Sequence, residues 1–375
     1  MQLNLPHFQF IKPSTSWKQK EATERGEFLT DKTKKLEDLR AQFAEADGGT
    51  IFTPKYQRIA DQIFSEGGRR PAPYAGIPTL LDAPQKPVET IQDLQVALFG
   101  VPMDLGVTNR NGARFGPRAL RAIERVGPYN DALETAPLHE MAVADIGDVP
   151  FRSRFDLAQS HEDIEAFARN IVTQHVLPMA VGGDHSITHP ILRAVGAEGP
   201  VGMIHIDAHC DTGGSYEGEK FHHGGPFRNA VLDGVLDPER TIQIGIRGAA
   251  GYIWEFSTLS GMTVIEAKDI TEERLPEIVA LARDVVGDGP TYLSFDIDSL
   301  DPAFAPGTGT PEVGGLTPRE AMKLIRGFKG VNFVGADVVE VAPAYDATSN
   351  TAQNGAQMLF EILSLMQFSP SLPKK

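Results

Sequence analysis

Short apolar runs alternate with amphipathic stretches from about residue 94 onward. The apolar runs predict strands, and the stretches with helical spacing between them predict helices. Near-continuous apolar strands that alternate with helices are typical of a parallel sheet covered on both faces. The predicted strands span residues 95–100, 141–147, 177–183, 201–207, 241–246, 262–267, 291–298 and 332–341, and the predicted helices span residues 116–126, 161–174, 274–286 and 318–328.

The first 90 residues have a different pattern. Residues 17–47 are rich in charge and are predicted to be helical in part, whereas residues 68–88 are rich in proline and glycine and predict an extended loop. We therefore divide the chain into an N-terminal extension, residues 1–90, and a main domain, residues 91–375. The extension is expected to pack on the main domain or on a neighbouring subunit, and a mobile arm is the alternative.

Composition narrows the class of protein. The chain has 375 residues, of which 41% are hydrophobic, so a packed α/β core is expected. A formal net charge of -15 argues against nucleic acid and anionic membrane surfaces as partners. The sequence contains neither an apolar run long enough to span a membrane nor the pattern of a signal peptide. A single cysteine fits the reducing cytoplasm, which is the predicted location.

Polar residues with metal-binding side chains stand where the predicted strands end. In open α/β sheets, sites form beyond the carboxyl ends of the strands, so these residues are expected to meet at one edge. In extended backbone, residues two apart face the same side, roughly 6.5 to 7 Å from each other. The metal-ligand candidates are His185 in GGDHS, Asp207, His209 and Asp211 in HIDAHCD, and Asp296 and Asp298 in FDIDSLDP.

Four carboxylates and two imidazoles are too many ligands for one catalytic zinc, which usually takes three. They suit two divalent ions roughly 3.5 to 4 Å apart, which would acidify a bridging water. Mixed oxygen and imidazole ligation favours manganese, nickel, iron or zinc over calcium. Cys210 lies between the candidate ligands His209 and Asp211 in the sequence, so its side chain is expected to face away from theirs as a buried thiol.

The motifs GGDHS, DAHCD, HHGGPF and SFDIDSLDPAFAPGTGTPEVGGLT resemble the ureohydrolase family, which includes arginase, agmatinase, guanidinobutyrase and guanidine hydrolase. The resemblance covers about residues 94–366. It implies a three-layer α/β/α fold with an eight-stranded, mainly parallel sheet, and a trimer or hexamer. It also implies two ions, one held by His185, Asp207, Asp211 and Asp296, and the other by Asp207, His209, Asp296 and Asp298.

The resemblance also implies the chemistry. The site is net negative when Glu340 is included, which favours a guanidinium cation paired with that carboxylate. Asp211 would pass a proton to the leaving nitrogen, and His223 matches the family's proton-transfer histidine. His222 either contacts the substrate or shapes its loop. His205 either hydrogen-bonds to a metal-ligand residue or is a histidine of the core. The predicted rim of the pocket contains Thr310 and Glu312.

Loop sequences narrow the range of candidate substrates. The segment TGGSYEGEKFHHGGPF lacks the arginase loop that holds the amino acid end of arginine. FHHGGPF and the long extension resemble the guanidine hydrolase branch, whose members act with nickel on guanidine, alkylated guanidines or biguanides such as metformin. Agmatinase and guanidinobutyrase, with manganese, are the alternatives. Asn111, where many relatives have proline, affects only the shape of its loop.

Two hypotheses from other classes are kept. A metal-dependent amide deacetylase would share the architecture but normally binds a single zinc ion. A non-catalytic subunit of a hetero-oligomer would release no urea, and the complete ligand set argues against it. The preferred prediction is a homo-oligomeric hydrolase, with a second type of subunit or a metal-insertion protein as possible partners.

Overall fold

The computed structural model describes residues 32–46, 51–54, 56–57, 60, 74–124, 126–248 and 251–374. The chain forms two compact units, residues 1–69 and 70–375. In the first unit, helix α2 (Lys32–Phe43) lies within the segment predicted to be partly helical. The Phe43 and Phe52 rings make an edge contact there, with 4.8 Å between their centroids. Residues 17–31 and 47 of that segment lie outside the described residues.

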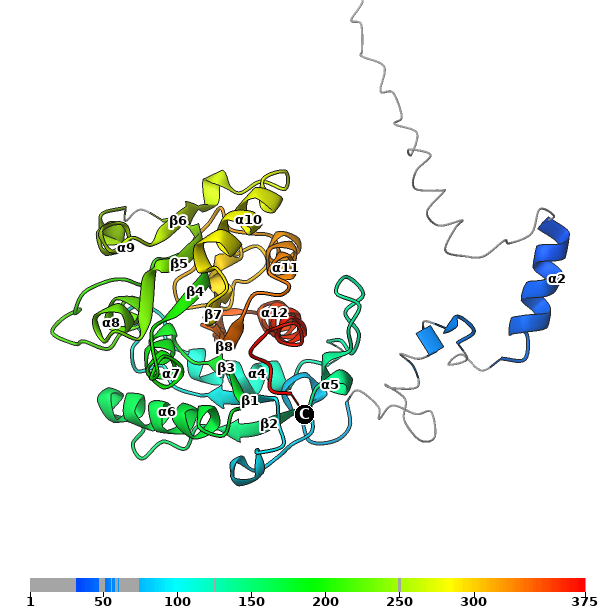
Figure 1. Cartoon of the computed structure of the whole chain (residues 1–375), viewed down its shortest axis with the longest axis horizontal. Coiled ribbons are helices and arrows are strands. Elements are labelled where there is room, and N and C mark those ends of the chain that lie inside the picture. The colour runs from blue at the N-terminus through cyan, green and yellow to red at the C-terminus, as the bar shows by residue number, and fades with distance from the viewer. Residues whose placement is uncertain are drawn as a thin grey trace, which may run out of the picture. The chain divides into compact units, whose positions relative to one another are not determined.

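The second unit is built on a sheet of eight strands, all paired in parallel (Figure 1). The strand order is β2-β1-β3-β8-β7-β4-β5-β6. The predicted sheet is therefore confirmed, and it is wholly rather than mainly parallel. The strands are β1 (Val96–Val101), β2 (Val143–Asp148), β3 (Leu177–Gly182), β4 (Val201–Ile206), β5 (Leu236–Ile246), β6 (Thr263–Glu266), β7 (Thr291–Asp296) and β8 (Phe333–Val339).

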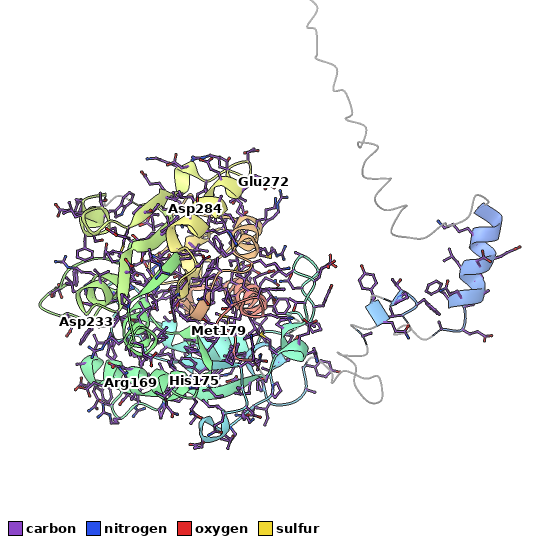
Figure 2. The ribbon with its side chains drawn as sticks, viewed as in Figure 1. Arg169, His175, Met179, Asp233, Glu272 and Asp284 are labelled. Atoms are coloured by element: carbon purple, nitrogen blue, oxygen red, sulfur yellow. The ribbon has the colours of Figure 1, made fainter. Side chains whose placement is uncertain are left out.

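Helices cover both faces of the sheet and complete three layers. Helices α6, α7 and α8 lie on one side, and α4, α10, α11 and α12 lie on the other (Figure 1). Met179, on β3, is fully buried between the layers, whereas Asp284, on α10, is exposed (Figure 2). The helices are α4 (Gly116–Arg121), α5 (Pro137–Glu140), α6 (Leu157–Val172), α7 (Thr188–Val195), α8 (Pro226–Leu232), α9 (Glu255–Ser260), α10 (Leu275–Val286), α11 (Pro318–Gly327) and α12 (Asn350–Met366).

The helices differ from the prediction in several places, since α5, α7, α8 and α9 were not predicted and α6 begins at Leu157 rather than at residue 161. The helix expected over residues 116–126 ends at Arg121. The longest described helix, α12, was not predicted. Its first turns contain asparagine, threonine and glycine, which have low intrinsic helix propensity, and its apolar residues then occur nearly without interruption. Burial of almost the whole of its second half against the sheet stabilises this helix, so tertiary packing overrides local preference.

The last part of the predicted extension belongs to the second unit. The short 3-10 helix η1 (Leu80–Asp82) contributes Leu80 and Leu81 to the core beneath α4 and α12. The Leu80 amide also donates a hydrogen bond of 2.9 Å to Asp145 Oδ2, at the edge of the sheet. The two compact units divide between residues 69 and 70, so residues 80–83 lie in the second unit.

Replacing Leu80 with alanine tests this assignment. Leu80 is fully buried, so Leu80→Ala is expected to lower the free energy of unfolding by about 2 to 5 kcal/mol. The matched control is Leu259→Ala, whose leucine is 79% exposed and should change the same quantity by no more than about 0.5 kcal/mol. Chemical denaturation at one protein concentration compares them. Equal stability of the two variants would place residues 80–83 outside the cooperative core.

Candidate metal centre

The predicted ligands converge because their strands are neighbours. His185 begins the 3-10 helix η4 (His185–Ile187) beyond β3, and Asp207 follows β4. Asp296 ends β7, and Glu340 follows β8. The order β3-β8-β7-β4 makes these four strands contiguous at the centre of the sheet. Since all are parallel, their carboxyl ends deliver the four side chains to one place.

One group of ligands surrounds the His185 imidazole. Its Nδ1 atom lies 3.1 Å from Asp207 Oδ2, 3.0 Å from Asp211 Oδ2 and 3.1 Å from Asp296 Oδ2. On the other side of the ring, Nε2 lies 2.8 Å from Ser294 Oγ. Ser294 in turn donates to Asp337 Oδ1 at 2.7 Å, so its oxygen accepts the Nε2 proton. In the neutral ring this leaves the Nδ1 lone pair directed toward the three carboxylates, where a metal ion would take it.

A second group surrounds His209. Its Nδ1 atom lies 3.6 Å from Asp207 Oδ1 and 3.2 Å from Asp298 Oδ2. The two groups share Asp207, which presents one carboxylate oxygen to each imidazole. Asp298 is positioned by its own amide, which donates to Asp296 Oδ1 at 2.8 Å. All six predicted metal ligands are thus brought together in two adjoining groups.

The donor set fits two divalent ions. Ligand atoms about 2.1 Å from one ion and at right angles to each other are roughly 3.0 Å apart, which matches the spacing around His185 Nδ1. That nitrogen is buried and has no hydrogen-bond partner. Burial raises the pKa of Asp296, and the neighbouring Asp298 and Asp207 raise it further. Carboxylates packed so closely require cations between them in order to ionise together.

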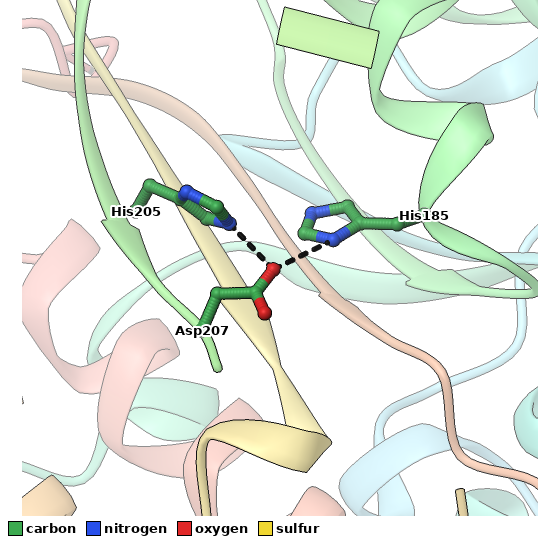
Figure 3. Close-up of side chains that lie close together, drawn as sticks. All are labelled: His185, His205 and Asp207. Carbon is green, nitrogen blue, oxygen red and sulfur yellow. Dashed lines mark hydrogen bonds and ion pairs between the residues drawn. The ribbon is translucent and has the colours of Figure 1, made fainter. Parts of the chain in front are cut away.

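His205 contacts the carboxylate of the predicted ligand Asp207. Its Nε2 atom lies 2.7 Å from Asp207 Oδ2, while Gln243 Nε2 donates to its Nδ1 at 3.1 Å. Figure 3 shows His185 and His205 on either side of the same Asp207 oxygen. Both ring nitrogens of His205 are engaged, so it orients Asp207 rather than serving as a free ligand. This geometry favours the first of its two predicted roles.

The backbone after β4 is bent rather than extended. The strand ends at Ile206, and Asp211 has a φ of 51°, in the left-handed region. The predicted alternation of faces therefore does not continue through HIDAHCD, although its three ligands still converge. Cys210 is 2% exposed and borders a cleft that opens beside the predicted ligands, and burial raises its pKa to about 12. It is a protonated thiol at neutral pH, in keeping with the predicted inert role.

Glu340 and His223 form a pair beside the ligands. His223 Nδ1 lies 2.9 Å from Glu340 Oε1, and the His185 amide donates to the same oxygen at 2.9 Å. The other carboxylate oxygen, Oε2, is buried and has no hydrogen-bond partner. Burial lowers the pKa of His223, but the charge and hydrogen bond of Glu340, together with the charges of Asp211 and Asp184, raise that pKa to about 9. Glu340 also has a left-handed φ of 63°, a strain often found at functional sites.

Comparisons with known proteins agree with this geometry. The model of the arginase family matches residues 94–364. The chain is 47% identical over 289 residues to the mitochondrial agmatinase of Gallus gallus, covering 75% of this chain and 84% of that protein. It is 48% identical over 297 residues to the guanidinopropionase of Pseudomonas aeruginosa, covering 78% and 92%. The chain belongs to the arginase family.

Solved structures extend this result to the fold of the arginase-family domain. The structure of proclavaminate amidino hydrolase from Streptomyces clavuligerus aligns with a TM-score of 0.75 at 34% identity, covering 79% of this chain and 98% of that one. The predicted ureohydrolase resemblance is therefore confirmed, and the chain is a metal-dependent amidinohydrolase with a two-metal site. The single-zinc amide deacetylase hypothesis is set aside.

The arginase-family centre opens into a cleft of about 440 Å³. The sequence predicted Thr310 and Glu312 at the rim of the pocket and left His222 with two possible roles, and all three residues line this cleft. His222 also lies 2.7 Å, through Nε2, from the Gly214 carbonyl, so it shapes the loop as well. Sequence reasoning missed other lining residues, because they lie far from the motifs or in runs without a distinctive pattern: Thr108, Tyr216, Arg247 and Trp254.

Arg247 organises the loops at the mouth of the cleft. Its guanidinium donates to the carbonyls of Asp298, at 2.6 Å, and Glu312, at 2.7 Å. Three further carbonyls accept from it, those of Gly245, Ser299 and Leu300.

The loop of Asn111 is fixed by one hydrogen bond. The Asn111 carbonyl accepts from Tyr345 Oη, which ties this loop to the residues after β8.

Proposed function

We propose that this chain hydrolyses the C–N bond of a small guanidino compound. The observation that carries the proposal is Glu340 Oε2, a buried carboxylate oxygen without a partner in a residue that lines the cleft beside the metal ligands. An unpaired buried carboxylate calls for a cation, and a guanidinium offers a planar donor group of matching geometry. The agmatinase and guanidinopropionase names of the relatives support the same class of substrate.

Each side chain then has a defined role. Two divalent ions held by the six ligands would lower the pKa of water to near neutrality. Glu340 orients the guanidinium, and Asp211 passes a proton to the leaving nitrogen. His223 moves protons between the site and the cleft. Thr310 borders the substrate and donates to Asp298 Oδ2 at 3.2 Å, while His222 forms part of the wall. Hydrolysis of guanidine would yield urea and ammonia.

The charge of the lining favours substrates without an acidic tail. Among the described residues that line the cleft, Arg247 is the one arginine or lysine, and its guanidinium is occupied by five backbone carbonyls. A guanidino acid would find no spare cation for its carboxylate. We therefore favour guanidine, an alkylated guanidine, or a biguanide such as metformin.

Agmatine is the second candidate, because one observation favours it. The Glu312 carboxylate is 38% exposed at the cleft and lies 3.7 Å from His209, so it could pair with the amine at the end of a cationic tail. Guanidinobutyrate, the other alternative, lacks such an observation. Tyr216 and Trp254 line the same cleft and suit either kind of cation through their ring faces.

Nickel is proposed as the metal, because FHHGGPF resembles the guanidine hydrolase branch. The oxygen-rich donor set also suits manganese, which is the alternative. We also propose a cytoplasmic homo-oligomer, a trimer or hexamer, in which the N-terminal extension packs on the main domain or a neighbouring subunit. The agmatinase relative is named as mitochondrial. Among the described residues, no helix has the length and apolar character needed to cross a membrane.

Release of urea or a substituted urea, together with ammonia or an amine, tests the proposal directly. The full chain would be loaded separately with nickel and manganese and supplied with guanidine, methylguanidine, metformin, agmatine, 4-guanidinobutyrate and arginine. We expect turnover of a substrate without a carboxylate, at least about 10²-fold faster than turnover of 4-guanidinobutyrate, given a desolvation cost of about 3 kcal/mol for the unpaired carboxylate. Preference for 4-guanidinobutyrate would overturn the argument from Arg247. No hydrolysis of any compound, with neither a urea nor an amine or ammonia released, would favour the non-catalytic subunit hypothesis.

A further inference from the structure

Thr108 makes two contacts with one atom of the proposed proton-transfer histidine. Its backbone N–H donates to His223 Nε2 at 3.1 Å, and its hydroxyl oxygen lies 2.7 Å from the same nitrogen. The opposite nitrogen of the ring, Nδ1, faces Glu340 Oε1. The imidazole is therefore held between Glu340 inside the site and Thr108 on the cleft side, and the following inference rests on the proposed function of His223.

The two groups of Thr108 differ in what they can do. A backbone N–H only donates, so it favours an unprotonated Nε2. A hydroxyl can donate to an unprotonated nitrogen and, after rotation, accept from a protonated one. The hydroxyl is thus able to stay bonded to His223 in both protonation states, whereas the amide satisfies only one of them. Glu340, which accepts from Nδ1, suits either state.

The loop that holds Thr108 is fixed from both sides. The Gly106 amide donates to Asp184 Oδ2 at 2.8 Å, and the Gly106 carbonyl accepts from the His223 amide at 2.9 Å. A Cβ atom at Gly106 would lie 2.9 Å from Ser186 Oγ and 3.2 Å from His222 Cα, so a larger residue there would push against both loops. Asp104, which is buried, closes the loop by accepting from the Gly112 amide at 2.7 Å.

We propose that Thr108 is a positioning residue whose hydroxyl follows His223 through its proton-transfer cycle. His223 is buried, whereas Thr108 is exposed and lines the cleft. The hydroxyl donates to Nε2 when the ring is neutral. When Nε2 has taken up a proton, the hydroxyl accepts from it until the proton passes on. The ring consequently keeps one orientation, with Nδ1 on Glu340, in both halves of the cycle.

Two substitutions separate the hydroxyl from the shape of the residue. Thr108→Val retains the amide and the branched shape but loses the hydroxyl, and we expect kcat to fall about 10- to 10²-fold while KM changes less than about threefold. Thr108→Ser retains the hydroxyl and should keep kcat within about threefold of the wild type. Thr173→Val, the same change at an exposed helix end, serves as the control. Metal content and thermal unfolding should match in all four proteins.

A second readout does not depend on turnover. Diethyl pyrocarbonate acylates the unprotonated imidazole nitrogen, and mass spectrometry of the metal-loaded protein follows His223. We expect Thr108→Val to raise its modification rate at least about tenfold and Thr108→Ser to leave it near the wild-type rate. Equal rates in the wild type and Thr108→Val, or unchanged kcat in Thr108→Val, would overturn the inference. If the wild type released no urea, the proposed function would fail, and the modification rates would still test the contact.

Discussion

Replacing Asp207 with asparagine is expected to abolish hydrolysis and to empty at least one metal site. Asp207 is the ligand that the two groups share, with one oxygen toward His185 and the other toward His209. An amide supplies one neutral oxygen in place of two charged ones, and its nitrogen would face a cation. We expect a loss of at least about 10³-fold in kcat, equivalent to about 4 kcal/mol of transition-state stabilisation. Urea release and metal content per subunit measure both effects.

The control for this change is Asp284→Asn, on the exposed side of α10 (Figure 2). It should retain about two ions per subunit and full activity. Chelation of the wild type should reproduce the loss, and reloading should restore activity in the wild type but not in Asp207→Asn. Two ions and normal turnover in Asp207→Asn would rule out a bridging ligand at this position.

Replacing Glu340 with glutamine should separate substrate binding from metal binding. Glu340 is not among the six ligands, so the variant should retain two ions. Its Oε1 contacts with the His185 amide and His223 can be kept by the amide oxygen. The free Oε2 would become an NH₂ group, which donates where the guanidinium also donates. We expect kcat/KM for guanidino substrates to fall at least about 10²-fold, because a charge-assisted pair is replaced by a repulsive contact.

Glu272→Gln is the matched control, since Glu272 forms a surface ion pair with Arg319 on the outer side of the domain. Its kcat/KM should stay within about twofold of the wild type. If Glu340→Gln lost its metal ions as well, Glu340 would be part of the metal centre rather than the substrate site. If it kept both metal content and kcat/KM, the guanidinium would have to bind elsewhere.

The sequence by itself determined the class of fold and the set of candidate ligands. Near-continuous apolar runs predict parallel strands because a strand covered on both faces has apolar residues at nearly every position rather than at every second one. Ligand residues at the ends of such runs must then meet at the carboxyl edge of the sheet. This reasoning located His185, Asp207, His209, Asp211, Asp296 and Asp298 without knowledge of strand order.

Only the tertiary structure decided which contacts complete the site. The contiguity of β3, β8, β7 and β4 arises from long-range pairing, which local periodicity does not encode. Ser294 and Asp337 lie within apolar strands. Their hydrogen bonds to His185 and to each other form only because β7 and β8 pair beside that histidine. Thr108 and Arg247 likewise gain their partners through folding, since loops from distant parts of the chain meet over one cleft. Packing across the sheet, rather than any local motif, therefore completed the centre.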